Sequence, residues 1–203
     1  ERKFPQAFVF IGESGTGKTS LARIVAMAIV CRQPDPKTGY PCLSCSNCKD
    51  IIDENFILSV HEENCSDLGI DRVRELADKA REQDFSGAPQ VFILNEYQEM
   101  ESKAQKNLLP ILENENSNAV FIITTMDKSK IPDAVKARSQ SFYLKPVDPN
   151  ILATWMVETL DKRKIKYPGE FLDPDVGGLF TIADCCKGSP RTALSMLEQA
   201  VYS

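Results

Sequence analysis

The sequence AFVFIGESGTGKTSLARIVAMAIVC, residues 7–31, contains a strand-like run, a glycine loop and a helical pattern in direct succession. Residues 6–12 are apolar, rich in β-forming types and end at glycine, and residues 19–31 have helical periodicity. Between them, GESGTGKT at residues 12–19 fits the pattern G-x-x-x-x-G-K-[ST]. A glycine-rich turn could match by accident, but a preceding strand and a following helix are the context that this motif requires.

The glycine loop predicts a nucleotide-binding site. Gly15 and Gly17 let backbone N–H groups turn inward around phosphates, and the N-terminus of the following helix adds partial positive charge. Lys18 is expected to reach the β- and γ-phosphates, and Thr19 to ligate Mg²⁺. The predicted nucleotide-binding residues of the loop are Gly12, Glu13, Ser14, Gly15, Thr16, Gly17, Lys18, Thr19 and Ser20.

Strand and helix patterns alternate through the first three quarters of the chain. Further strands are predicted at residues 57–64, 91–97 and 119–126, and further helices at 49–56, 69–83 and 103–115, with a turn at 86–90. The two later strands are continuous apolar runs, which is typical of strands buried on both faces. The sequence therefore predicts an α/β fold in which helices cover both faces of a parallel sheet.

The pattern changes after residue 146, because only helices are predicted beyond it. These helices cover residues 149–165, 175–187 and 189–203. We therefore predict a nucleotide-binding domain at residues 1–146 and a small helical domain at 147–203.

Four cysteines gather in an irregular insertion at residues 31–48, rich in Pro, Gly and Ser. Cys31 precedes a C-x₂-C-x₂-C run of Cys42, Cys45 and Cys48, and four thiolates suit a closed tetrahedral zinc site. An iron–sulfur cluster and unligated thiols are the alternatives. Three other cysteines, Cys65, Cys185 and Cys186, are interpreted as small buried hydrophobic residues, and the single His61 as structural.

The composition limits the class of protein. The 203 residues include 42% hydrophobic ones, and the net charge of −5 argues against indiscriminate coating of nucleic acid. The apolar runs are too short to span a bilayer, no secretion signal opens the chain, and we expect a cytoplasmic protein without a membrane partner. Because the first residue is not Met, we expect a fragment.

Several motifs in one order resemble the bacterial DNA polymerase III gamma/tau clamp-loader subunits. The motifs are GESGTGKTSLA, the cysteine insertion, GIDRVRELADKA, VFILNEY with KAQKNLLPILE, FIITTMDKSKIP, KARSQSFYLKPV and GSPRTALSMLEQA. The resemblance covers essentially the whole chain, and the order of so many motifs is more specific than any one of them.

The resemblance implies an AAA+ ATPase, with a RecA-like α/β domain, a zinc-binding insertion and a three-helix lid. Its implied cofactors are ATP, Mg²⁺ and Zn²⁺. Its implied partners are neighbouring subunits of a pentameric spiral, a ring-shaped sliding clamp and the backbone of primer–template DNA. The family's N-terminal adenine-contacting segment and C-terminal collar have no counterpart in this sequence.

Three residues match positions of the family that sense phosphate. Thr125 matches the sensor-1 position, Arg138 matches an arginine finger that serves the neighbouring subunit's ATP, and Arg191 matches the sensor-2 arginine of the lid. The residues that flank Arg138 differ from the family's pattern. A surface ion pair is the alternative interpretation for either arginine.

One position departs from the family in a chemically important way. The strand of the family ends in Asp-Glu, where Asp serves Mg²⁺ and Glu polarises water, but this chain has Asn95-Glu96. Asn95 offers only a neutral oxygen to a cation that prefers carboxylates, so we expect ATP binding with slow hydrolysis. Glu99 or Glu101 could compensate as a displaced acid, or simply face solvent.

Three functions remain open from the sequence. The first is a clamp-loader motor subunit, favoured by Lys18, Arg138 and Arg191. The second is a hydrolytically weak, nucleotide-gated scaffold, favoured by Asn95. The third is a P-loop signalling or defence NTPase with the same core. Lys103 and Lys106 are weak candidates for contacts with the DNA backbone.

Overall fold

The computed structural model describes residues 4–55, 59–81, 89–112, 118–167, 169–172 and 177–202. The chain divides into two compact units, one with Glu1–Ile11 and Lys18–Tyr143, the other with Gly12–Gly17 and Leu144–Ser203. The domain boundary after residue 146 stays a prediction. Within the described parts of the chain, no helix has the length and apolarity needed to cross a membrane.

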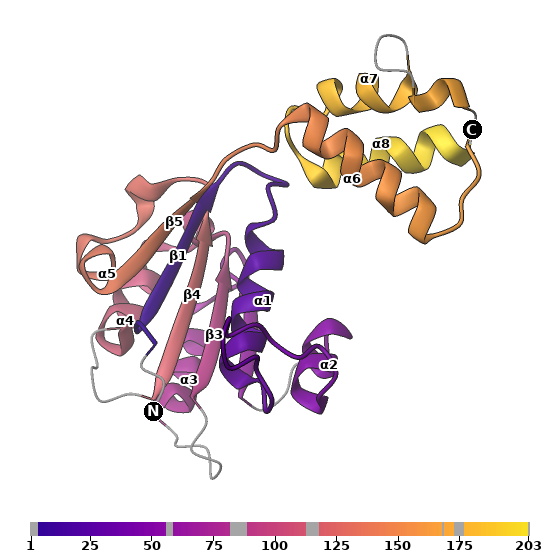
Figure 1. Cartoon of the computed structure of the whole chain (residues 1–203). Helices are drawn as coiled ribbons and strands as arrows, with labels where there is room; N and C mark the ends of the chain where they lie inside the picture. The colour runs from indigo at the N-terminus through magenta and orange to yellow at the C-terminus, as the bar shows by residue number, and fades with distance from the viewer. Residues whose placement is uncertain are drawn as a thin grey trace. The chain divides into compact units, whose positions relative to one another are not determined.

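A five-stranded sheet forms the centre of the first unit (Figure 1). Its strands are β1 (Ala7–Gly12), β2 (Val60–Asn64), β3 (Gln90–Asn95), β4 (Ala119–Thr125) and β5 (Ser139–Leu144). The spatial order is β2-β3-β4-β1-β5, and the pairs β2–β3, β3–β4 and β4–β1 are parallel. The carboxyl ends of these four parallel strands therefore lie at one edge, where the glycine loop leaves β1.

Helices cover both faces of the sheet, as the continuous apolar strands predicted. On one face, alternate strand residues such as Phe92 and Phe121 join a core with α3 (Ile70–Arg81) and α4 (Ser102–Leu112). On the other face, α1 (Lys18–Val30) contacts β3 and β4, and α2 (Ser46–Ile52) contacts α1. The predicted α/β class is thus confirmed.

Some element boundaries differ from the prediction. Helix α2 begins inside the segment predicted to be irregular, and β3 ends at Asn95, although it was predicted to reach residue 97. In the described residues, the sequence patterns also missed α5 (Asp133–Arg138), β5 and the short 3₁₀-helices η1 (Tyr97–Glu99), η2 (Lys128–Lys130) and η3 (Gly169–Leu172). Predictions for residues 56–58, 82–88, 113–117 and 175–176 fall outside the described residues.

The helical part of the second unit has a core of its own. It contains α6 (Pro149–Lys162), the 3₁₀-helix η3 (Gly169–Leu172), α7 (Gly178–Cys185) and α8 (Pro190–Tyr202). Core residues from the three α-helices include Leu152, Met156, Leu160, Leu179, Ala193 and Leu197. The Asp148 carboxylate caps α6 by accepting from the backbone N–H of Asn150 at 2.9 Å.

The three cysteines outside the insertion and the single histidine were predicted to have structural roles, and most of them are packed against other residues. Cys65 and Cys186 are buried as predicted, but Cys185 is exposed, because it lies on the solvent side at the end of α7. His61 stacks on Phe92 with ring centroids 5.0 Å apart and hydrogen-bonds to Gln90 at 3.2 Å. The prediction that Cys185 is buried was therefore wrong.

Candidate functional site

The glycine loop has the backbone conformation that its sequence requires. Gly15 and Gly17 have φ angles of 77° and 91°, in the left-handed region that side chains disfavour. The Thr16 hydroxyl donates to the carbonyl of Glu13 at 2.8 Å, which closes the turn. Lys18 begins α1 and is only 4% exposed, so its charged group is positioned by its surroundings rather than by solvent.

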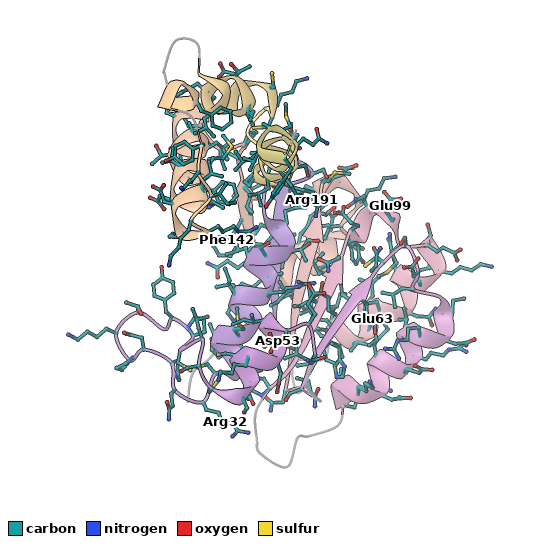
Figure 2. The ribbon with its side chains drawn as sticks, turned by 90° about the vertical axis from the view of Figure 1, so that its right-hand side faces the viewer. Arg32, Asp53, Glu63, Glu99, Phe142 and Arg191 are labelled. Atoms are coloured by element: carbon teal, nitrogen blue, oxygen red, sulfur yellow. The ribbon has the colours of Figure 1, made fainter. Side chains whose placement is uncertain are left out.

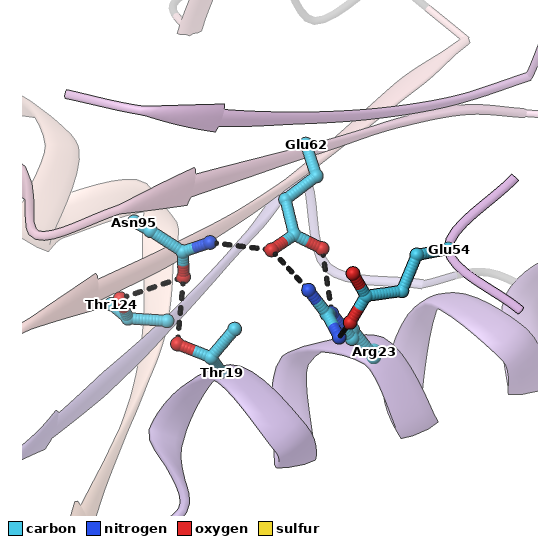
Figure 3. Close-up of polar contacts among 6 residues, drawn as sticks. All are labelled: Thr19, Arg23, Glu54, Glu62, Asn95 and Thr124. Atoms are coloured by element: carbon cyan, nitrogen blue, oxygen red, sulfur yellow. Dashed lines mark hydrogen bonds and ion pairs between the residues drawn. The ribbon is translucent and has the colours of Figure 1, made fainter. Parts of the chain in front are cut away.

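The end of β3 is directly linked to the start of α1. The Thr19 hydroxyl donates to Oδ1 of Asn95 at 3.0 Å, and the Thr124 hydroxyl on β4 donates to the same oxygen at 3.1 Å (Figure 3). The structure therefore brings together two of the predicted site residues, 76 positions apart in the chain.

An acid and an arginine complete this network on its other side. The Asn95 amide nitrogen donates to Oε1 of Glu62 on β2 at 2.9 Å (Figure 3). Arg23 of α1 donates to both oxygens of Glu62, from Nε at 2.8 Å and from Nη2 at 3.0 Å. Its Nη1 also donates to Glu54 at 2.6 Å. A carboxylate thus lies beside Asn95, one strand away from the predicted position.

Glu96 has an unusual backbone conformation and its own partner. Its φ and ψ of 53° and 51° are left-handed, which costs a residue with a side chain about 1–2 kcal/mol. Its carboxylate accepts from the Gln98 amide nitrogen at 2.6 Å. The Gln98 oxygen in turn accepts from the Thr125 hydroxyl at 2.8 Å. Gln98 therefore joins the predicted water-polarising acid to the predicted sensor.

The remaining predicted residues lie elsewhere. Arg138 is the last residue of α5 and Arg191 the second residue of α8, and both are exposed. By residue membership, Arg191 belongs to the same compact unit as the loop Gly12–Gly17. The acid hydrogen-bonded to Asn95 is Glu62, whereas the prediction named Glu99 and Glu101, which are both exposed.

The four cysteines of the insertion converge. The sulfur atoms of Cys31, Cys42, Cys45 and Cys48 all lie within 4.8 Å of one another. A tetrahedral site with zinc–sulfur bonds of about 2.3 Å places its sulfurs roughly 3.8 Å apart, so this cluster fits zinc with little adjustment. Burial raises the pKa of the Cys48 thiol to about 12, and metal binding at this position must therefore displace a proton.

Backbone N–H groups donate to sulfur atoms of the cluster, and such hydrogen bonds stabilise thiolates. The N–H of Cys42 donates to the sulfur of Cys31, and the N–H of Cys45 to that of Cys42, each at 3.3 Å. Hydrogen bonds from Ser44 lower the pKa of Cys42 to about 6. The Asn47 side chain ties the insertion to α1 by donating to the carbonyl of Val30 at 2.8 Å.

Sequence reasoning missed four members of the site: Arg23, Glu62, Gln98 and Thr124. Thr124 adjoins the predicted Thr125, and strand alternation would have placed the two hydroxyls on opposite faces. Glu62 and Glu63 are adjacent glutamates, and the sequence alone does not show which of them faces Asn95. Glu63 faces the other helix layer and pairs with Arg72 of α3 (Figure 2).

Comparison with known proteins decides the family. The family model described as "DNA polymerase III, delta subunit" matches residues 1–148. The chain belongs to this DNA polymerase III family. A DNA polymerase III subunit gamma/tau from Mycoplasma genitalium is 34% identical over 197 residues, which are 97% of this chain and 32% of that protein. The chain thus spans about a third of that relative, and the predicted resemblance to gamma/tau subunits is confirmed.

Solved structures support the fold of this polymerase III family member. A gamma subunit-related protein from Thermotoga maritima has a TM-score of 0.52 and 14% identity, covering 95% of this chain and 52% of that chain. RuvB from the same organism has a TM-score of 0.61 and 12% identity, covering 95% and 53%. At this identity the likeness concerns the fold alone, which is of the AAA+ type.

Proposed function

We propose that the chain is the ATP-binding part of a clamp-loader subunit, an ATPase that opens a sliding clamp and loads it on primer–template DNA. The observation that carries the proposal is the hydrogen bond between Thr19, directly after the buried Lys18, and Asn95 at the end of β3. Glu96 follows immediately. A phosphate-binding lysine, a magnesium-binding hydroxyl and a water-polarising acid are the parts that phosphoryl transfer requires.

The residues present fit an ATP–magnesium pair. Thr19 gives its hydroxyl proton to Asn95, which leaves its lone pairs available to hold Mg²⁺. The cation would supply positive charge that offsets the phosphate oxygens. Lys18 would hold the β- and γ-phosphates, and Glu96 would orient the attacking water.

The two arginines would contact the γ-phosphate of ATP, and these contacts would be lost after hydrolysis. Arg191 would act on ATP bound to its own chain, and Arg138 on ATP bound to a neighbouring subunit. Their exposure is compatible with binding an anion that is delivered from outside the chain. Thr125 would serve as the sensor on β4, through Gln98.

Asn95 is expected to slow hydrolysis more than it weakens binding. A neutral amide oxygen offsets less of the charge on the cation than a carboxylate does. A hundredfold slower turnover corresponds to about 2.7 kcal/mol of lost transition-state stabilisation.

The wider setting follows from the same proposal. Partners would be other clamp-loader subunits, the sliding clamp and the DNA backbone, and the cysteine cluster would hold structural zinc. Lys103 and Lys106 are exposed on α4 and are available to phosphates. A cytoplasmic location is expected for such a replication protein.

A second candidate function is a nucleotide-gated scaffold that binds ATP but does not drive a motor cycle. Asn95 is the observation that favours it, because the site would retain its phosphate contacts while lacking one acid. Arg138 speaks against it, since a scaffold has less need of an arginine that serves a neighbour.

The test is to measure ATP affinity and turnover of the full-length protein, alone and reconstituted with its neighbouring subunits, clamp and DNA. The motor proposal expects turnover to rise at least about tenfold, 1.4 kcal/mol in barrier, when clamp and primer–template DNA are added together. Lys18→Met should abolish that turnover. Lys37→Met, in the exposed part of the insertion, is the matched control and should change nothing.

Binding of ATP without stimulated turnover would favour the scaffold. Failure of the full-length protein to bind ATP at all would overturn both candidates.

A further inference from the structure

The orientation of the Asn95 amide is determined by its neighbours. Its oxygen receives protons from two hydroxyls, Thr19 at 3.0 Å and Thr124 at 3.1 Å. The Thr124 oxygen accepts from the backbone N–H of Glu96 at 3.2 Å, so its own proton is free to point at Asn95. Glu62 is a carboxylate and can only accept, so the amide nitrogen must face it.

Glu62 is itself held in place by Arg23. Two nitrogens of Arg23 contact its two oxygens in the parallel arrangement that is strongest for arginine and carboxylate. The Glu62 side chain is only 11% exposed, so this pair is shielded from solvent. The hydrogen bond to Glu62 raises the pKa of the Arg23 guanidinium above its usual range. With Glu54 also on Arg23, the three groups together carry one net negative charge.

We propose that Glu62 is a positioning residue for the magnesium site, where it fixes the Asn95 oxygen towards Thr19. This inference rests on the proposed ATP–magnesium function. If the amide were reversed, its N–H₂ would face Thr19 and occupy a hydroxyl lone pair that the cation needs. Glu62 prevents the reversal, because a reversed amide would set an oxygen against a carboxylate.

The same geometry explains why an amide stands at position 95. An aspartate there would place a second carboxylate oxygen where the amide nitrogen is now, 2.9 Å from Glu62. Two carboxylate oxygens at that distance repel each other. Asn95 and Glu62 therefore form a matched pair, in which the amide on β3 donates to the carboxylate on β2.

The experiment is a cycle of four full-length proteins: wild type, Glu62→Gln, Asn95→Asp and the double variant that exchanges the two groups. Affinity for Mn²⁺ is measured by electron paramagnetic resonance with saturating ADP, which does not require hydrolysis. ADP binding without metal is measured on the same samples.

Glu62→Gln is expected to weaken Mn²⁺ affinity by roughly 10- to 100-fold, as loss of an outer partner of a metal ligand does. Asn95→Asp is expected to bind Mn²⁺ no more tightly than wild type at pH 7, because Glu62 repels the added carboxylate. The double variant makes the same hydrogen bond in reverse, so it should recover the affinity that Glu62→Gln loses.

Glu63→Gln is the matched control. Glu63 neighbours Glu62 but pairs with Arg72 on the opposite face of the sheet, so metal affinity should not change. If Glu62→Gln does not fold, the comparison of Asn95→Asp with the double variant still tests the pair.

Unchanged metal affinity in Glu62→Gln, or tighter binding by Asn95→Asp, would overturn the inference and leave the proposed function intact. Absence of ADP binding by wild type would overturn the proposed function, and this inference with it.

Discussion

Polar side chains at the end of β3 divide between the two faces of the sheet. Asn95 contacts Thr19 of α1, whereas Glu96 contacts Gln98, which contacts Thr125 on β4. Neighbouring residues of a strand point to opposite faces, and the left-handed turn at Glu96 adds to the separation. One peptide bond thus separates the group proposed to serve the cation from the group proposed to serve water.

The first prediction at this scale concerns Gln98. Gln98→Ala should lower kcat about tenfold, or 1.4 kcal/mol, because the Glu96 carboxylate loses the donor that orients it. KM for ATP should change little, since the hydrogen-bond partners of Gln98 are Glu96, Thr125 and the backbone N–H of Met126, and none of these belongs to the glycine loop. Steady-state ATPase assays on the reconstituted full-length protein measure both constants.

Gln105→Ala is a suitable control for Gln98→Ala. The Gln105 side chain donates to the carbonyl of Met100 at 3.0 Å, five residues away in the chain. Thr125 should keep its buried position in Gln98→Ala, because its single hydroxyl proton can then go to the carbonyl of Asp127, which lies 3.1 Å away. A parallel rise in KM would show that Gln98 acts on nucleotide binding instead.

Residue-level sequence reasoning found the end of β3 but not its partners. Lys18, Thr19 and Asn95 could be predicted because a glycine loop and a strand end carry local signals. Glu62 could not be distinguished from Glu63, because the face that each occupies depends on the pairing of β2 with β3, where Glu62 lies opposite Ile93. The residues within a strand do not reveal how that strand pairs with a segment far away in the sequence.

At the scale of elements, the insertion and α2 depend on the cysteine cluster. Helix α2 has only seven residues, and the residue before it, Cys45, provides no side-chain cap. Isolated helices of this length do not persist in water. Cys48 lies in the first turns of α2 and is fully buried, so a metal at the cluster would anchor the helix to the rest of the insertion.

Cys48→Ser is therefore expected to destabilise the protein by about 2–4 kcal/mol, as a ligand is lost and a hydroxyl is buried. For a chain of this size the melting temperature should fall by roughly 5–15 °C. Differential scanning calorimetry measures the change. Metal analysis of the wild type should find one zinc ion per chain.

Cys185→Ser provides the control, because Cys185 is exposed and lies outside the cluster. It should leave both zinc content and melting temperature unchanged. Freshly reduced wild-type protein without bound metal would refute the zinc assignment.

Elements buried on both faces were predictable, and marginal ones were not. Every residue of β4 is buried, so its apolar run identifies it as a strand. Strand β5 lies at a sheet edge with most residues partly or fully exposed, and α5 has only six residues. Neither provides enough hydrophobic periodicity to be recognised.

At the scale of the whole molecule, the two units have separate hydrophobic cores. Arg138 lies in the unit with the sheet, and Arg191 in the unit with the helices. If each arginine contacts the γ-phosphate as proposed, activity requires contributions from more than one unit and more than one chain. That requirement can be tested by mixing variants.

Arg138→Ala should leave ATP binding by the isolated protein unchanged and lower turnover of the assembly about 10³-fold, as removal of an arginine finger does. Subunits with Lys18→Met cannot use ATP but still present Arg138. Mixing the two inactive variants should therefore restore part of the ATPase activity of the assembly.

Lys162→Ala, an exposed change on α6, serves as the control for surface charge. Weaker ATP binding by isolated Arg138→Ala would indicate that Arg138 acts within its own chain. Absence of recovery in the mixture would count against a role between chains.

The ion pairs of β2 have a consequence for solubility. Among the described strands, β2 is at one edge of the sheet, where an open backbone invites another strand to pair. Its adjacent acids point to opposite faces, Glu62 to Arg23 and Glu63 to Arg72, so charges are fixed on both sides of this edge. Inward charges of this kind oppose edge-to-edge aggregation. The acid proposed to orient the magnesium site would thus also help to keep crowded copies of the chain from pairing at this edge.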